Sequence, residues 1–264
     1  MVFSRNEANF FGIFRALGQT PQVDVVRRAG VEFAASATVP WPRGIFSADP
    51  GPRSVDELVG RTAAAIRAGE CPNLWIVSPD NGPAALPHAL EKRGFSETAA
   101  WPAMRADASR FTDHGDGGPL RVSAIRDESR LGRFAEIVLR RPPGDAEAAA
   151  FARMFASARA RDPQAFTFFL GEVDGRSVAA SMRFLSGDTA GIYWVATLPE
   201  YRRAGFGTAM TRHAAAEARH AGAAACVLHA TRMGESIYRR LGFETVFTYR
   251  GYSLPDPTVH PAEP

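Results

Sequence analysis

A glycine-punctuated turn between an apolar strand and an alanine-rich helix is the clearest chemical feature of the sequence. The segment 195–210 reads VATLPEYRRAGFGTAM and contains the spacing Arg202-x-x-Gly205-x-Gly207. Glycines allow a tight turn, and the first N–H groups of a helix have no partner within the helix. These N–H groups, the helix dipole and the neighbouring Arg202 and Arg203 favour a phosphate. The sequence therefore predicts an anion-binding site at this turn.

Length and composition set limits on the protein that carries this turn. The chain has 264 residues, enough for one large domain or two of about 100–150 residues. Its 45% apolar and 22% charged residues are typical of a soluble globular protein. The net charge of +3 is spread along the sequence, which suits an anionic small molecule better than a nucleic-acid duplex.

Targeting and redox features favour a cytoplasmic protein. No apolar run approaches the roughly 20 residues that span a membrane, and the N-terminal MVFSRNEANFF lacks the pattern of a signal peptide. Cys71 and Cys226 give neither a disulfide framework nor a metal-binding spacing. We therefore expect reduced thiols, a cytoplasmic location and no bound metal.

The elements that must position the glycine turn lie in the second half of the chain. The polar, glycine-rich segment 110–119 indicates a linker between a domain over 1–109 and another over 120–254. The proline-rich segment 255–264 indicates a flexible tail. The second domain predicts strands over 120–125, 166–173, 177–185, 190–198, 226–231 and 243–254, and helices over 127–139, 145–160, 205–221 and 235–241. Three antiparallel strands that lead into a parallel crossover predict a mixed sheet.

The first half predicts a shorter set of elements. In chain order these are a helix over 6–17, hairpin strands over 23–28 and 31–39, a proline-rich connection over 40–52, a helix from Ser54, a strand over 73–78, a helix over 86–93 and a strand over 95–106. Ser54 and Glu57 have the spacing of a capping box at the start of their helix.

The two halves share an internal repeat. Residues 89–106 (ALEKRGFSETAAWPAMRA) and 237–254 (IYRRLGFETVFTYRGYSL) both run from a short basic helix through Gly-Phe into a strand. The first copy has Leu90 where the second has Tyr238, and nothing before Ser54 matches the Arg-x-x-Gly-x-Gly spacing. We therefore interpret the first half as a shortened copy that serves as scaffold or substrate wall.

Two blocks in the second half, in this order, resemble the GNAT superfamily of acyl-CoA-dependent N-acetyltransferases. They are 195–210 (VATLPEYRRAGFGTAM) and 230–244 (ATRMGESIYRRLGFE). The resemblance covers 120–254 well and the first half only as a degenerate GNAT-like copy. It implies an α/β (α+β) fold with a mixed, mostly antiparallel sheet whose fourth and fifth strands splay apart between flanking helices.

The resemblance also implies that acetyl-CoA, as a co-substrate, lies between the splayed strands. Its pantetheine arm would bond to the backbone of Val195 and Thr197. Its pyrophosphate would sit on the turn formed by Arg202, Arg203, Ala204, Gly205, Gly207 and Thr208. Thr231 stands where this family frequently has an asparagine, and its hydroxyl can still hydrogen-bond near the cofactor.

The resemblance makes Tyr238 the acid that protonates the departing thiolate. Acyl transfer also needs a neutral amine about 3 Å from a polarised carbonyl, for which the backbone N–H of Val195 is a candidate donor. The sequence leaves three candidates for the general base: His229, Glu172 and a water chain. A core histidine without a catalytic role is the alternative for His229, and a packed ring with a hydrated hydroxyl is the alternative for Tyr238.

Together these features predict transfer of an acetyl or other acyl group from acetyl-CoA to a primary amine in a ternary complex. The acceptor would be a small molecule or a peptide, with no nucleic-acid or membrane partner, and the protein would be a monomer or homodimer. Tyr193 and Trp194 alternate along their strand, so one should face the acceptor and the other the core. Two alternatives are a non-catalytic acyl-CoA sensor or interaction module, and a tandem-type transferase that makes a small thiol or aminoacyl conjugate.

Overall fold

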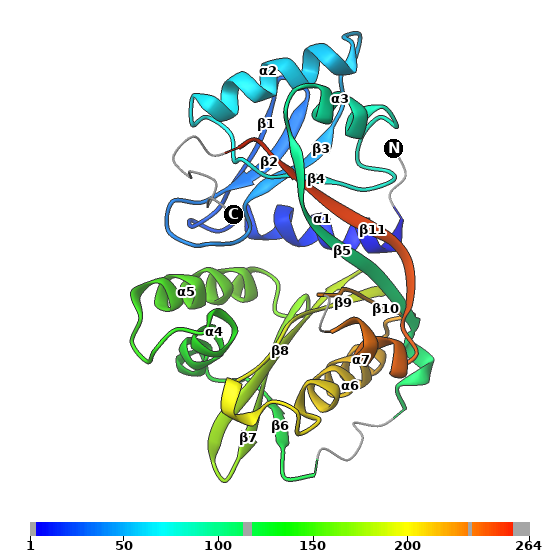
Figure 1. Ribbon diagram of the computed structural model, residues 1–264. Helices are drawn as coiled ribbons and strands as arrows, with labels where there is room; N and C mark the ends of the chain where they lie inside the picture. Colours follow the sequence, from blue (N-terminus) through cyan, green and yellow to red (C-terminus); the bar gives the residue numbers. More distant parts are fainter. Residues whose placement is uncertain (1–3, 113–117, 232–233, 256–264) are drawn as a thin grey trace, which may run out of the picture.

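A continuous sheet of 11 strands runs through the computed structural model, which describes residues 4–112, 118–231 and 234–255. Figure 1 shows the first half of the chain above the second, with helix α1 (Arg5–Leu17) across the boundary. The strand order is β1-β2-β3-β4-β11-β5-β10-β9-β8-β7-β6. Part of the expected linker, 113–117, and nearly all of the expected tail, 256–264, lie outside the described residues.

The second half has the mixed sheet that its sequence predicts. The strands β6 (Arg121–Ala124), β7 (Phe166–Val173), β8 (Arg176–Ser186) and β9 (Thr189–Thr197) are antiparallel, and β10 (Ala225–His229) is parallel to β9. Helices α4 (Leu131–Leu139) and α5 (Ala146–Arg161) pack with α1 on one face of this sheet, and α6 (Phe206–His220) packs on the other. The short helix α7 (Glu235–Arg240) follows β10, and one-turn helices lie at η1 (Ala108–Arg110), η2 (Glu128–Arg130) and η3 (Pro199–Tyr201).

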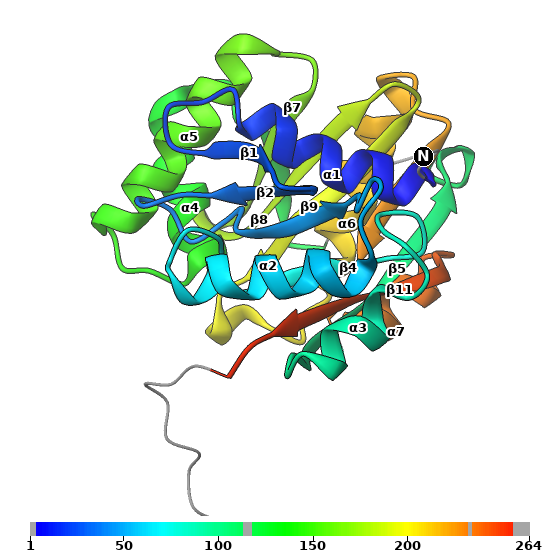
Figure 2. The same cartoon turned by 90° about the horizontal axis from the view of Figure 1, so that it is seen from above.

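The first half repeats part of this plan on a smaller scale. Its elements after α1 are β1 (Asp24–Arg28), β2 (Val31–Ala35), β3 (Gly44–Ala48), α2 (Val55–Arg67), β4 (Trp75–Val77), α3 (Leu86–Lys92) and β5 (Ser96–Asp107). Helices α2 and α3 enclose a separate core that contains Leu58, Trp75 and Leu90. As Figure 2 shows from above, α2 lies over the strands of this half. The helix begins with the expected capping box of Ser54 and Glu57.

The two halves exchange their final strands. Strand β5 ends the first half but pairs with β10 of the second half, while β11 (Glu244–Ser253) pairs with β4 of the first half. Between these partners β5 and β11 run antiparallel to one another over most of their length. The repeated helix–strand segments found in the sequence therefore lie at the centre of one shared sheet.

Strand β3 was not predicted. The sequence was expected to form a connection without a strand over 40–52, but residues Gly44–Ala48 form one. All five residues of Gly44–Ala48 are buried. A strand that is buried on both faces has no polar–apolar alternation, and the prolines around this one mask it further.

Helix α1 is held against the second half through a buried asparagine, Asn9. The Asn9 side-chain amide donates to the carbonyls of Phe184 (3.2 Å) and Thr189 (2.9 Å), and its carbonyl oxygen accepts from the Tyr193 hydroxyl at 2.7 Å. A Cβ added at Gly191 would lie 2.1 Å from Asn9 Oδ1, so the close approach of α1 depends on this glycine. These contacts place the aromatic residues of α1 beside β9.

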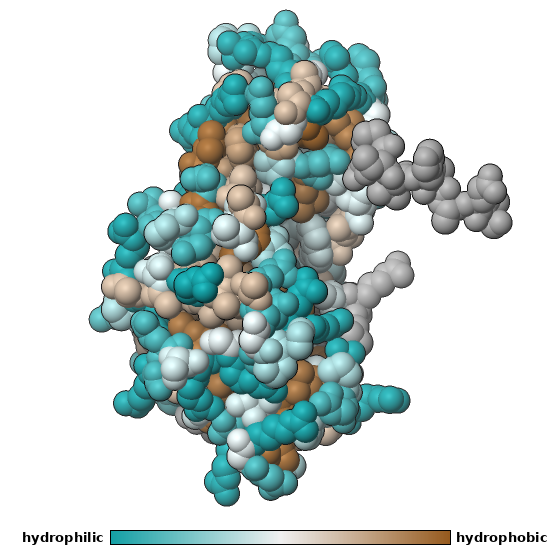
Figure 3. Space-filling view, turned by 90° about the vertical axis from the view of Figure 1, so that its left-hand side faces the viewer, coloured by the Kyte–Doolittle hydropathy of each residue, from teal (hydrophilic) through white to brown (hydrophobic). Residues whose placement is uncertain are grey.

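The longest helix in the described part of the chain, α5, has 16 residues. None of the helices there is both long and apolar enough to cross a bilayer. Polar side chains cover most of the face shown in Figure 3, with small apolar patches between them.

Candidate active site

The strands β9 and β10 separate halfway along their length. Their pairing ends at Gly191 and Val227, although β9 continues to Thr197. On its other side β10 stays paired with β5 along its whole length. Backbone groups of β9 beyond Gly191 therefore face an opening, and the expected splay of these strands is confirmed.

A β-bulge in β9 turns additional side chains toward this opening. Residues 194 and 195 lie opposite the single residue Ser181 of β8, and Trp194 has a positive φ of 54°. Because the bulge interrupts the alternation of the strand, Tyr193 and Trp194 both line the cleft. Tyr193 is buried in the core with its hydroxyl on Asn9, whereas Trp194 is partly exposed, and which of the two meets the acceptor stays a prediction.

The opening widens into a cleft of about 1120 Å³ between the two halves of the chain. One wall comes from β9, the turn after it, α6 and α7. The opposite wall comes from α1, the loop between β2 and β3, β4 and β5. Among the described residues, no group of three or more His, Cys, Asp or Glu side chains is arranged to hold a metal ion.

The turn before α6 has the properties of an anion cradle. No side chain caps the N-terminus of α6, whose N-cap residue Gly205 has a left-handed backbone (φ 81°). A Cβ at Gly205 or Gly207 would meet no atom within 4 Å, and both glycines line the cleft, so the turn is open to it. Arg202 donates from Nε to the carbonyl of Thr197 at 3.2 Å, and its side chain stays exposed beside the turn. The geometry suits a phosphate group.

Tyr238 lies on the cleft wall in α7. Burial raises the pKa of Tyr238 to about 12, so the phenol is protonated at physiological pH. Its ring packs edge-on against Phe243, with a centroid distance of 6.1 Å. Thr231 also lines the cleft, and its hydroxyl accepts from the N–H of Gly234 at 3.3 Å.

His229, at the end of β10, lies among aromatic rings. Its ring is 4.4 Å from Phe10, 5.4 Å from Tyr193 and 6.1 Å from Tyr249, centroid to centroid. Burial lowers the pKa of His229 to about 4, so the imidazole is neutral at physiological pH. It faces the cleft, where it can accept a hydrogen bond from a ligand.

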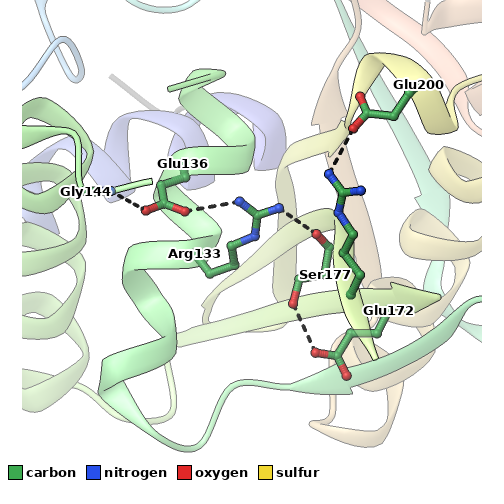
Figure 4. Close-up of polar contacts among 7 residues, drawn as sticks. Arg133, Glu136, Gly144, Glu172, Ser177 and Glu200 are labelled. Carbon is green, nitrogen blue, oxygen red and sulfur yellow. Dashed lines mark hydrogen bonds and ion pairs between the residues drawn. The ribbon is translucent and has the colours of Figure 1, made fainter. Parts of the chain in front are cut away.

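Glu172 does not lie with the other candidates. It is on β7, away from the residues that line the cleft, where it is ion-paired with Arg130 and accepts from the Ser177 hydroxyl at 3.0 Å. Figure 4 shows the hydrogen bond from Ser177 to Glu172, and it shows Arg133 of α4 donating to the Ser177 carbonyl (2.8 Å). These contacts tie the β7–β8 hairpin to α4 and its neighbouring turn.

The cleft therefore collects most of the residues that the sequence analysis singled out. They are Val195, Thr197, Arg202, Arg203, Gly205, Gly207, Thr208, Thr231, His229 and Tyr238. Ala204 is in the turn but not in the lining, and Glu172 is elsewhere.

Several lining residues were missed because they come from the first half. Trp41 packs edge-on against Trp194 (5.4 Å between ring centroids), and Arg43 follows it in the same loop. The one sequence signal was a tryptophan between two prolines, Pro40 and Pro42, in a connecting segment.

Comparisons with known proteins agree with this geometry. Residues 186–246 match the family model described as an acetyltransferase (GNAT) domain. The structure is similar to a GCN5-related N-acetyltransferase from Kribbella flavida, with a TM-score of 0.72 and 18% identity over 96% of this chain and 95% of that one. It is also similar to a GCN5-related N-acetyltransferase from Sphaerobacter thermophilus (TM-score 0.60, 17% identity, 87% of this chain and 75% of that one).

A tandem GNAT protein from the clavulanic acid biosynthesis pathway resembles both halves together. Its TM-score is 0.61 at 14% identity, over 91% of this chain and 86% of that one. No curated protein matches the sequence. The chain thus has the GNAT fold, and the resemblance drawn from its two sequence blocks is confirmed.

Proposed function

We propose that this chain, whose second half carries a GNAT acetyltransferase domain, transfers an acetyl group from acetyl-CoA to a primary amine. The observation that carries the proposal is the uncapped N-terminus of α6 at the mouth of splayed strands. Its two open glycines lie in the same cleft as a half-buried, protonated tyrosine. Together they provide an anion site, a slot for an extended arm and an acid.

The residues present fit coenzyme A along the length of the cleft. The backbone groups of β9 at Val195 and Thr197 would bond to the amides of the pantetheine arm. The pyrophosphate would be held by the turn, through Arg202, Arg203, Ala204, Gly205, Gly207 and Thr208. The Thr231 hydroxyl lies on the opposite side of the slot, where it would bond to the arm.

Two protein groups would act on the thioester itself. The N–H of Val195, in the bulge, would polarise the thioester carbonyl. Tyr238 would donate its proton to the sulfur as the carbon–sulfur bond breaks. Because its pKa is about 12, Tyr238 holds this proton across the physiological range.

The amine must reach the carbonyl without its proton. His229 is neutral at physiological pH, so it does not repel a cationic amine on entry. Its pKa of about 4 makes it a weak base. We propose that the imidazole accepts a hydrogen bond from the attacking amine and that water in the cleft carries the proton to solvent.

Mass spectrometry of the purified protein for retained coenzyme A, followed by an amine screen with a free-thiol readout, tests the proposal. We expect bound coenzyme A and amine-dependent thiol release. Tight coenzyme A binding without thiol release from any amine would instead indicate an acyl-CoA sensor. Absence of coenzyme A binding would remove the basis of the proposal.

A further inference from the structure

The part of the cleft beyond the coenzyme A slot has an aromatic wall built by four separate elements. Trp41 from the loop between β2 and β3 packs edge-on against Trp194 of the bulge and against Phe14 of α1, each at 5.4 Å between ring centroids. Trp194 is also 5.3 Å from Phe151 of α5. Both tryptophans keep part of their surface exposed in the cleft. Such a wall favours a flat, apolar ligand.

Two arginines border this wall without a protein partner. Arg43 lies two residues after Trp41, and Arg140 ends α4 with a left-handed backbone (φ 55°). Both are exposed, and within the described part of the chain neither forms an ion pair or a side-chain hydrogen bond. In Figures 1 and 2 the loop that carries Arg43 lies close to α4 and α5.

Negative charge is scarce in the same cleft. The one carboxylate among its described lining residues is Glu200, beside the cradle, and it is ion-paired with Arg176 at 3.4 Å. A site for a polycationic amine needs carboxylates to replace the water around its charges, and this lining does not supply them. Free guanidinium groups instead fit a carboxylate, which they can bind through paired N–H groups.

We propose that the acceptor is a primary amine with an aromatic body and a carboxylate. The aromatic body would pack against Trp41 and Trp194, and the carboxylate would pair with Arg43 or Arg140. The amine would then point toward Val195 and His229. This inference rests on the proposed function for the role of the ligand, but the binding site itself can be tested without turnover.

Binding is measured first, by calorimetry in the presence of coenzyme A. The probes are matched pairs that differ only in the carboxylate: 4-(aminomethyl)benzoate with benzylamine, and tryptophan with tryptamine. Spermidine and a lysine-rich peptide represent polycationic acceptors. We expect the better carboxylate probe to bind at least about 10-fold more tightly than its partner, and spermidine not to bind. Equal affinity within both pairs, or preference for spermidine, would overturn the proposal.

Variants then assign the carboxylate contact. Arg43→Gln removes one guanidinium, and Arg140→Asn removes the other with a residue that accepts a left-handed backbone. We expect at least one to weaken binding of the carboxylate probe about 10-fold, with little change for its uncharged partner. Arg67→Gln, an exposed arginine of α2 outside the cleft, is the matched control. Weaker binding of coenzyme A itself would assign the arginines to its phosphates and overturn the proposal.

Thiol release separates this inference from the proposed function. Selective binding of the carboxylate probe without thiol release would support the acceptor site and contradict acetyl transfer. Thiol release with spermidine but not with the carboxylate probes would support acetyl transfer and contradict the acceptor site.

Discussion

Helices α2 and α6 hold corresponding places in the two halves, since each connects two strands that run parallel, β3 to β4 and β9 to β10. Their N-termini differ. The Ser54 hydroxyl accepts from the Glu57 N–H at 3.1 Å, and the Glu57 carboxylate accepts from the Ser54 N–H at 3.1 Å. The N-terminus of α6 follows Gly205 and has no such cap. The N-terminus of α2 is thus closed by its own side chains, one of them a carboxylate that would repel a phosphate. The N–H groups at the N-terminus of α6 have no side-chain cap and are open to a ligand.

The gaps between the paired strands differ in the same way. Strands β3 and β4 pair only at Ile45 and Trp75, and the Asn81 side chain bridges the rest by donating to the carbonyls of Phe46 (3.2 Å) and Ile76 (2.6 Å). In the described second half no hydrogen bond joins β9 to β10 past Gly191. We infer that the Asn81 amide fills the gap between β3 and β4, whereas the corresponding gap between β9 and β10 stays open for a ligand. We therefore expect ligand binding to depend on which backbone groups each half leaves unsatisfied.

Loss of the Tyr238 hydroxyl should have the largest effect. This residue has no counterpart in the first half, where Leu90 is buried in the core. We expect Tyr238→Phe to lower kcat about 1,000-fold, with unchanged affinity for coenzyme A, because only proton donation is lost. Steady-state kinetics and calorimetry measure the two quantities. Tyr252→Phe, at a buried tyrosine outside the cleft, is the control, and full turnover by Tyr238→Phe would contradict its role as the acid.

His229 should make the protein acid-sensitive. Because its pKa is about 4 in the folded protein and about 6.5 when unfolded, the unfolded chain binds more protons as the pH falls from 6.5 to 4. The free energy of unfolding should decrease by about 3 kcal/mol over this range. Denaturant unfolding at both pH values measures this, and His229→Phe should remove most of the decrease. His88→Phe, at an exposed histidine of α3, should not.

The two turns before α2 and α6 offer a matched pair of substitutions. Gly51 and Gly205 both have positive φ and open space around a Cβ, so glutamate meets similar backbone strain at each. We expect Gly205→Glu to weaken coenzyme A binding about 100-fold, or about 2.8 kcal/mol, and Gly51→Glu to leave it unchanged. Equal effects in calorimetry would contradict the distinction between the two turns.

Asn81 should matter for stability and not for binding. Asn81→Ala leaves the carbonyls of Phe46 and Ile76 without these donors, and we expect the free energy of unfolding to fall by about 2 kcal/mol. Affinity for coenzyme A should be unchanged. A variant that keeps full stability would show that Asn81 does not hold β3 and β4 together.

The smallest effect should come from the cap of α2. Ser54→Ala removes one acceptor from an exposed helix end, and we expect a loss of about 1 kcal/mol in chemical denaturation. Because we assign no ligand to α2, we expect the turnover of the Ser54→Ala variant to be unchanged. Altered coenzyme A affinity in this variant would contradict that assignment.

Local patterns predicted the features that depend on a few neighbouring residues. The Ser54–Glu57 box, the helix after Gly205 and the repeated Gly-Phe blocks each have their signal within a few positions. The exchange of β5 and β11 could not be predicted, because both strands come from similar repeats and their partners are chosen by register across the sheet. The role of Asn81 depends on how two strands approach one another. The bulge at Trp194 could not be predicted, because no sequence pattern indicates the unfavourable backbone angle that this residue adopts.

Only one of the two halves is expected to bind coenzyme A. Titration of the purified protein with coenzyme A in a calorimeter measures the stoichiometry directly. We predict one molecule per chain, with binding greatly weakened in Gly205→Glu and retained in Gly51→Glu. Two molecules per chain, or one that persists unchanged in Gly205→Glu, would contradict this expectation.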